Sequence, residues 1–197
     1  MVHMPNLETD RLTIRPFVLG DLAAIHRILD IELADADFGS EGAGTFEQRE
    51  QWLRWSILNY EQLARLYQPP YGDRAIVLRA RGDVIGACGY VPSFGPFAQL
   101  PGYPNAKSGR AHNVPAFGLF YAVAPAHQRH GYALEAARAL VDHAFRELYL
   151  ERIVATTTFD NTASIRVMEK LGMRIERNPL PKPPWFQVVG HIGRDDD

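Results

Sequence analysis

The stretch Val123-Ala-Pro-Ala-His-Gln-Arg-His-Gly-Tyr-Ala133 joins a strand-like segment to the most regular helical pattern in the chain. Amide groups at a helix N-terminus have no intrahelical partners, and they carry partial positive charge. A loop whose backbone converges on such a terminus is therefore an anion site, suited above all to a pyrophosphate. Gly131 and Ala133 leave the backbone accessible, while Arg129 and His130 add positive charge at the rim. Spacing alone leaves an ordinary strand-to-helix turn as the alternative.

The segments that flank this stretch predict a strand before it and a helix after it. Residues 117–123 have strand character. The residues that follow place apolar side chains at i, i+3, i+4 and i+7, the spacing of an amphipathic helix. These positions are Ala133, Ala136, Ala137, Leu140, Val141, Ala144, Phe145 and Leu148. Further strands are predicted at residues 11–15, 75–79, 84–91, 152–159 and 185–189, and Arg81-Gly82-Asp83 predicts a hairpin that joins 75–79 to 84–91.

Capping residues predict where three further helices begin. Asp21 precedes one helical pattern, and Asn161 precedes a short one that ends at Leu171-Gly172, where glycine suits the position after a helix. Thr45 and Gln48 form a capping-box pattern ahead of a long amphipathic segment. The order of strands and helices predicts an α+β domain with a mostly antiparallel sheet.

Two features lie between these elements. Trp52 and Trp55 follow helical spacing in the long amphipathic segment, and this predicts that both pack in the core. Residues 92–115 hold five prolines and three glycines without periodicity, which predicts an unusually long loop. Such a loop is a functional lid, an oligomer contact or a disordered segment.

Composition excludes several classes of protein. The chain has 197 residues, which fits a single domain over 1–197, and a formal net charge of −2, which gives no broad field for nucleic acid or an anionic membrane. Its one cysteine, Cys88, excludes an intrachain disulfide and a cysteine-clustered zinc site, and we expect it to be inert core. Because no apolar run approaches about 20 residues and no signal peptide is visible, a soluble cytoplasmic protein is expected.

Three motifs occur in order and in matching predicted contexts. Gln128-x-x-Gly131-x-Ala133, between strand and helix, resembles the pyrophosphate-binding signature of the GNAT acetyltransferase superfamily. The segment Leu7-Glu-Thr-Asp-Arg-Leu-Thr-Ile-Arg-Pro16 is similar to the start of its RimJ/RimL-like branch, which acetylates protein N-termini. Asn161-Thr-Ala-Ser164-Ile-Arg-Val-Met-Glu-Lys-Leu-Gly-Met173 resembles a strand-to-helix motif of that branch. The resemblance covers most of residues 7–176.

This resemblance implies a fold and a donor substrate. The fold is a mixed, mostly antiparallel sheet flanked by helices, with a V-shaped split between two central strands that receives acetyl-CoA. Backbone groups of one strand pair with the pantetheine arm, loop amides hold the pyrophosphate, and Asn161 bonds near the amide or thioester. No metal is implied. The residues assigned to the cofactor are Tyr121, Ala122, Val123, Gln128, Arg129, His130, Gly131, Tyr132, Ala133, Leu134, Asn161 and Ser164.

The sequence departs from the family pattern at the position of the general acid. Many GNAT enzymes carry a tyrosine in the last helix that protonates the departing thiolate, and Met168 stands there in this chain. Methionine has no proton to give. Ser164 is then the candidate general acid, as in the RimL-like pattern, and a helper in capping the helix is its alternative role.

A second departure concerns the general base. RimJ/RimL-like enzymes often carry an acidic residue early in the central strand, and Gly118 stands in its place. Glu41 is our candidate base, and Asp35 or His112 could also act through water. An α-amine, with a pKa of about 8, is partly neutral near pH 7.5, whereas a lysine amine near 10.4 is about one part in a thousand neutral. A site without an obvious base therefore favours an α-amine or another weakly basic amine.

Two functions remain open at this point. The first is an acetyl-CoA-dependent N-acetyltransferase acting on a protein N-terminus or a small-molecule amine, with a homodimer among its possible assemblies. The second is a non-catalytic acyl-CoA-binding or interaction module on the same fold, which the two departures favour. A loop at 92–115 folded over the site would favour small acceptors, and one that pairs protomers would leave the cleft open to peptides.

Overall fold

The structure is a computed structural model that describes residues 4–36, 43–102, 114–183 and 185–194. Its strands are β1 (Leu7–Glu8), β2 (Leu12–Pro16), β3 (Gly72–Leu78), β4 (Val84–Gly95), β5 (Val114–Val123), β6 (Arg152–Thr157), β7 (Arg174–Arg177) and β8 (Val188–Gly193). Its helices are α1 (Leu22–His26), α2 (Phe46–Arg65), α3 (Tyr132–Arg146) and α4 (Thr162–Lys170). Short helical turns are η1 (Leu19–Asp21), η2 (Arg27–Glu32), η3 (Phe97–Gln99) and η5 (Pro125–His127), of which η2 is a π-helix.

The chain forms two compact units, the first of residues 1–91 and 120–140 and the second of residues 92–119 and 141–197. In the first unit, β1, β2, β3 and β4 pair in that order, each antiparallel to the next. The predicted hairpin is confirmed: the N–H of Leu78 donates to the carbonyl of Asp83 at 2.9 Å, and Gly82 takes the left-handed conformation in the turn. The predicted strands at 11–15, 75–79 and 84–91 are thereby confirmed.

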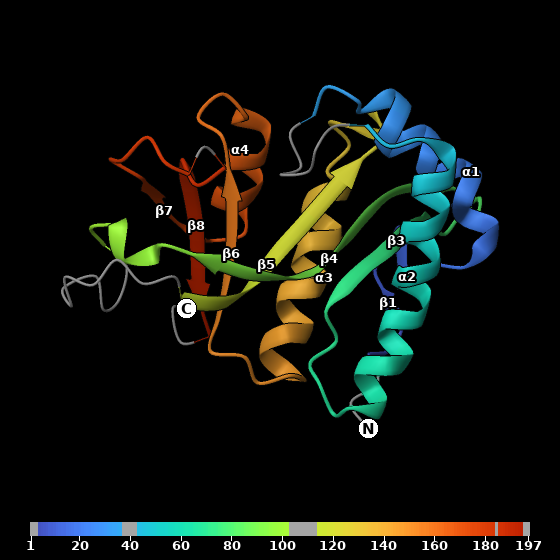
Figure 1. The fold of residues 1–197 in the computed structure, drawn as a ribbon, viewed down its shortest axis with the longest axis horizontal. Helices are drawn as coiled ribbons and strands as arrows, with labels where there is room; N and C mark the ends of the chain where they lie inside the picture. Colours follow the sequence, from blue (N-terminus) through green and yellow to red (C-terminus); the bar gives the residue numbers. More distant parts are fainter. Residues whose placement is uncertain (1–3, 37–42, 103–113, 184, 195–197) are drawn as a thin grey trace. The chain divides into compact units, whose positions relative to one another are not determined.

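The core of the first unit lies where α1, η2 and α2 pack on the β3–β4 ladder (Figure 1). Phe17 and Trp52 meet edge to face with ring centroids 5.4 Å apart, so the core prediction for Trp52 is supported. The prediction for Trp55 was wrong, because 57% of this side chain is exposed. The two tryptophans are three residues apart and lie at different angles around the helix, one inside and one outside.

The helix starts in the first unit follow local chemistry. The capping box of α2 is confirmed: Gln48 N–H donates to Thr45 Oγ1 at 3.3 Å, and Thr45 N–H donates to Gln48 Oε1 at 2.8 Å. Asp21 precedes α1 but makes no side-chain cap bond to it. Its carboxylate instead accepts from Arg15 at 2.7 and 2.9 Å and from the N–H of Val18 at 2.9 Å. The carboxylate of Asp21 therefore binds the nearby guanidinium of Arg15 and not the N–H groups of α1.

In the second unit the strand order is β5, β6, β8, β7. β5 and β6 are parallel and pair at Phe117–Ile153 and Gly118–Val154, while β8 is antiparallel to both of its neighbours. The expected mixed, mostly antiparallel sheet is confirmed. The split between β5 and β6 stays a prediction. The buried core here is formed by Phe97, Leu100, Val154, Phe186 and Val189.

Part of the segment predicted as loop 92–115 is regular structure. β4 continues through Gly95, and η3 follows, so the loop prediction was wrong for residues 92–95 and for the β5 residues 114–115. Pro92 is the reason that the strand was not predicted. Proline has no N–H to donate in a sheet, and it usually marks the end of a strand or an edge strand. Gly95 permits close packing, because a Cβ there would lie 2.9 Å from the Phe186 ring. Residues 103–113 lie outside the described part of the chain.

Two expectations from the composition concern Cys88 and membrane-spanning helices. Cys88, on β4 opposite Arg74, is fully buried, and burial raises the pKa of its thiol, as expected for inert core. Among the helices of the described residues, none combines the length and the apolar character needed to cross a membrane.

Candidate functional site

The predicted anion loop lies in the first unit, between the end of β5 and the start of α3. Gln128 Nε2 donates to the carbonyl of Val123 at 3.0 Å and so ties the loop back to the strand. Arg129 has φ 64° and Gly131 has φ 84°, both in the left-handed region. Glycine adopts that conformation without steric cost. Residues other than glycine rarely adopt it, and the cases that occur are concentrated at functional sites. The loop is therefore held in a specific, partly strained shape.

The backbone of this loop presents a row of hydrogen-bond donors. The N–H groups of residues 129–134 donate to none of the residues that the structure describes. The next N–H, that of Glu135, donates to the carbonyl of Gly131 at 3.0 Å and begins the helical ladder. Because α3 is a long helix, its N-terminus also carries partial positive charge. The arrangement has the donors and the charge to hold a di-anionic or pyrophosphate group, and this role of the loop stays a prediction.

An arginine that the sequence reasoning did not single out supports this loop from β2's side. Arg11 Nη1 donates to the carbonyl of His130 at 3.0 Å, and Arg11 Nε donates to Glu135 Oε2 at 2.7 Å. Its guanidinium carbon lies 4.5 Å from the centroid of the Tyr132 ring. Thr9 Oγ1 donates to the other Glu135 oxygen at 2.6 Å. Arg11 thus joins the loop, the helix and the N-terminal motif.

The charge of Glu135 fits this role. Burial opposes its ionisation, but hydrogen bonds from Thr9 and Arg11 outweigh burial and lower the pKa of the carboxyl. Glu135 is therefore ionised at neutral pH and holds Arg11 in place. A signal was present in the sequence, since Arg11 belongs to the N-terminal motif that resembled the RimJ/RimL-like branch, but its partner is far along the chain.

The strand residues assigned to the pantetheine arm end β5. Ala122 and Val123 are buried, and Tyr121 is half-buried. β4 approaches β5 closely here, since a Cβ on Gly86 would collide with the carbonyl oxygen of Ala122. Glycine at position 86 therefore permits the backbone approach that fixes the end of β5. Ala133 and Leu134, in the first turn of α3, are half-buried.

The remaining candidate residues lie in the second unit. Asn161 caps α4, because its Oδ1 accepts from the N–H of Ser164 at 3.1 Å, and Gly172 follows the helix with φ 84°. Both predictions for this helix are confirmed. Asn161 is exposed and Ser164 is half-buried. Met168 is fully buried and packs beside Gly190, so this side chain serves the core.

The general base remains a prediction. Glu41 and His112 lie outside the described residues. Asp35 is exposed. Gly118 is buried in the parallel pair opposite Val154, and glycine has no side chain that could act as a base.

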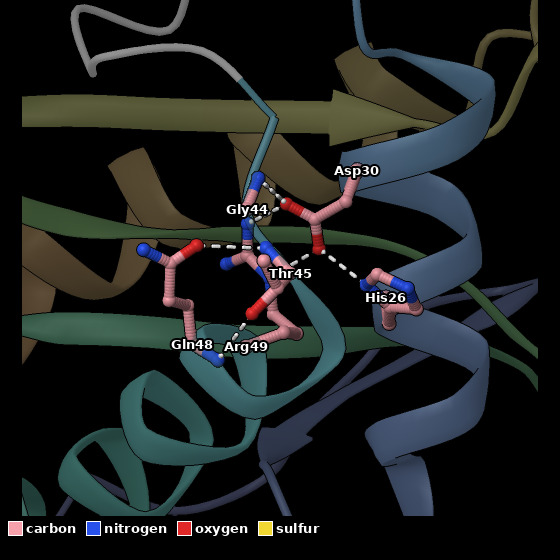
Figure 2. Close-up of polar contacts among 6 residues, drawn as sticks. All are labelled: His26, Asp30, Gly44, Thr45, Gln48 and Arg49. Atoms are coloured by element: carbon pink, nitrogen blue, oxygen red, sulfur yellow. Dashed lines mark hydrogen bonds and ion pairs between the residues drawn. The ribbon is translucent and has the colours of Figure 1, made fainter.

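A second polar cluster joins η2 to the start of α2 in the first unit (Figure 2). Asp30, with a side chain only 1% exposed, accepts two hydrogen bonds from Arg49, each 2.7 Å long. It also accepts from the N–H of Gly44 at 2.8 Å and lies 3.0 Å from His26 Nδ1. Burial opposes ionisation, but these bonds outweigh it and lower the pKa of Asp30. The cluster fixes the segment that leads into α2.

The described part of the chain contains no group of three or more His, Cys, Asp or Glu side chains arranged to hold a metal ion.

Comparison of the sequence with those of known proteins identifies a matching family and a relative from Bacillus subtilis. The profile of a family described as "Acetyltransferase (GNAT) domain" matches residues 11–174. A Bacillus subtilis (strain 168) protein named "Uncharacterized N-acetyltransferase YoaA" is 32% identical over 173 residues, which are 87% of this chain and 84% of that protein.

Solved structures with a similar fold span nearly the whole chain. An acetyltransferase (GNAT family) from Bacillus anthracis matches with a TM-score of 0.69 and 23% identity, over 96% of this chain and 99% of its own. RimL, a ribosomal L7/L12 alpha-N-protein acetyltransferase in complex with coenzyme A, matches with a TM-score of 0.66 and 15% identity, over 98% and 100%. A nucleotide-linked sugar GNAT also matches. At these identities the likeness shows the fold.

Proposed function

This chain belongs to the GNAT acetyltransferase family, and from that premise we propose that it transfers the acetyl group of acetyl-CoA directly to a protein N-terminal α-amine or to the amine of a small molecule. The resemblance found in the sequence is confirmed, and the chain is an N-acetyltransferase, which makes it an acyltransferase. Its structural neighbours include RimL as well as other branches of the family. The family match includes residues of both compact units, and we propose that they form one acetyltransferase domain.

The observation that carries the donor assignment is the row of N–H groups at residues 129–134. These donors are unused by the described protein residues and lie at the positive end of a long helix. A pyrophosphate would supply acceptors for several of them at once. The Arg11–Glu135 ion pair lies beside the row, and the bond from Arg11 to the carbonyl of His130 helps to keep the loop in its shape.

The proposed chemistry needs few protein groups. Acetyl-CoA supplies an acyl group already activated as a thioester. Backbone groups of residues 121–123 pair with its pantetheine arm, and Asn161 hydrogen-bonds near its amide or thioester. The neutral amine attacks the carbonyl carbon, a C–N bond forms and the C–S bond breaks. Ser164 gives a proton to the departing sulfur and regains one from solvent, while the amine proton leaves to a base, for which Glu41 is our candidate.

An α-amine is the acceptor that the site favours. Gly118 stands where an acidic residue would serve as base, so an acceptor that is already partly neutral is best suited. RimL, one of the structural neighbours, is described as an alpha-N-protein acetyltransferase. Peptides with a free N-terminus and no lysine should be acetylated faster than the same peptides with a blocked N-terminus and one lysine. Mass spectrometry of the products would measure this, and preference for the lysine peptide would refute it.

Thermal unfolding with and without acetyl-CoA tests the donor site. At about 100 times its dissociation constant the ligand adds about 2.7 kcal/mol to the free energy of unfolding. For a chain of this size we expect a rise in Tm of roughly 5–10 °C with acetyl-CoA and with CoA, and none with ATP. The absence of a shift with both CoA species would refute the site. A shift without acetylation of any amine in a broad screen would favour the non-catalytic module.

Replacing Arg11 by alanine should weaken acetyl-CoA binding more than turnover. The variant loses the contacts to His130 and Glu135 that hold the pyrophosphate loop, and charged hydrogen bonds of this kind contribute about 1.5–3 kcal/mol. We expect KM for acetyl-CoA to rise about tenfold with kcat within about twofold of wild type.

Steady-state kinetics with a matched exposed variant would test this expectation. Arg81, which pairs with Asp83 at the hairpin, can be replaced by alanine as the control, and its KM should not change. Arg11→Lys keeps the charge but not the forked geometry, so it should recover part of the loss. A fall in kcat with unchanged KM would contradict a positioning role for Arg11.

A further inference from the structure

Exposed apolar side chains form a stripe along one face of α2 in the first unit. The exposed fraction is 57% for Trp55, 55% for Leu58 and 65% for Leu66, which follows the helix directly. Their spacing of i, i+3 and i+11 places them on one face, opposite the face where Leu53 and Ser56 are buried. A large aromatic side chain left exposed beside other apolar residues indicates a contact surface.

Charged residues flank one side of this stripe in a repeating pattern. Glu50 and Arg54 form an ion pair of 2.6 Å one turn apart, and Glu61 and Arg65 repeat the acid-then-base order one turn apart. Arg54 and Glu61 are seven residues apart and so share a face. Within the described residues, Glu61 and Arg65 take part in no ion pair, so both charges face solvent in the isolated chain.

We propose that this face of α2 binds the α2 helix of a second copy of the same chain, in antiparallel orientation. In that register Trp55 packs against Leu58 of the second copy, and Leu58 packs against its Trp55. The helical repeat then brings Arg54 opposite Glu61 of the second copy, and by symmetry Glu61 opposite its Arg54. One register therefore pairs Trp55 with Leu58 and also satisfies both charge pairs.

The order of the charges identifies a second copy as the occupant. Reversing the helix direction exchanges acid and base, so that Glu50-Arg54 meets Glu61-Arg65 with opposite charges throughout. A two-fold interface uses one patch on both subunits, and a patch on a single helix must be self-complementary in this way to form one. A partner of different sequence could bind this face without the charges of the helix complementing those of its own reversed copy.

The size of the patch sets the expected affinity. Two apolar side chains and two charge pairs per copy bury much less than the roughly 800 Å² per partner of a standard stable interface. We therefore expect reversible dimerisation that becomes visible between about 1 μM and 1 mM.

Sedimentation velocity of the full chain across that concentration range tests the proposal. Arg54→Glu and Glu61→Arg each place like charges opposite one another twice, and each should weaken dimerisation at least about tenfold. An equimolar mixture of the two variants restores both attractive pairs in the heterodimer. Its dissociation constant should lie within about threefold of the wild-type value.

Control variants separate this contact from effects on folding. Both charge variants lie on an exposed face, and their Tm should stay within about 1–2 °C of wild type. Arg54→Lys keeps the charge and should dimerise almost as wild type. Trp55→Ser should dissociate the dimer. A chain that stays monomeric to 1 mM, or a dimer that Arg54→Glu leaves unchanged, would overturn the proposal, as would a variant mixture no stronger than its components.

Discussion

Replacing Asp30 by alanine is expected to lower the free energy of unfolding by about 3 kcal/mol or more. Asp30 is 1% exposed and accepts from Arg49, Gly44 and the ring of His26 (Figure 2). Removing one partner of a buried pair leaves the other charge without compensation, so the cost exceeds the net value of the pair. The Tm should fall by about 6–12 °C, as calorimetry would measure.

A second ion pair on α2 provides the matched control. Arg54 donates to Glu50 at 2.6 Å, a length close to the 2.7 Å of the Arg49–Asp30 bonds, but Glu50 is 36% exposed. Solvent screens such a pair, so Glu50→Ala should change stability by no more than about 0.5 kcal/mol. Equal losses from Asp30→Ala and Glu50→Ala would show that burial does not govern these pairs.

The Asp30 contribution should depend on pH in one direction. Because the pKa of Asp30 is lower in the folded chain, its stabilisation is fully present above the unfolded-state value of about 3.9 and is lost as the pH falls through the folded value. The stability difference between wild type and Asp30→Ala should therefore be constant near neutrality and shrink in acid. A difference that grows as the pH falls would contradict the assignment.

Replacing Ser164 by alanine is expected to lower kcat by about 100-fold, with a smaller effect on KM for acetyl-CoA. A positioned general acid contributes about 10²–10⁴-fold to rate, and Met168 cannot take over its role. The helix cap should survive, because Asn161 accepts from the backbone N–H of Ser164 and not from its hydroxyl. The loss would then report chemistry and not folding.

Thr162→Ala is the control for this experiment, since Thr162 is exposed at the first position of the same helix. Its kcat should be unchanged. Steady-state kinetics at saturating acetyl-CoA would compare the two variants, and the thermal shift with CoA would verify that each still binds the donor. A Ser164→Ala enzyme within about twofold of wild-type kcat would remove Ser164 from the mechanism.

Features with local causes were predictable from the sequence. The capping box of α2, the Asn161 cap of α4, the hairpin turn and the periodic helix α3 depend on residues a few positions apart, and each was confirmed. Prediction failed where the cause was not local. The apolar residues of α2 surround much of the helix, so periodicity could not tell that Trp52 packs inward while Trp55 is exposed.

The candidate site shows the same division. The strand, loop and helix of the proposed anion site were predictable, since they are consecutive in the sequence. The residues that fix it were not: Arg11 and Glu135 are 124 positions apart. Asp30 and Arg49 are 19 positions apart, and nothing in the pattern around Asp30 distinguishes a buried acid from a solvated one.

The burial of Cys88 has a practical consequence for studying this protein. It is the only cysteine of the chain, it has no exposed surface, and burial disfavours its thiolate, the form that reacts. The native protein should therefore be silent toward colourimetric thiol reagents. In an assay that detects free thiols, any signal would therefore come from released coenzyme A. No correction for the thiol of the protein itself would be needed. A cysteine introduced on the surface would accept a single spectroscopic label, with no need to remove the native one.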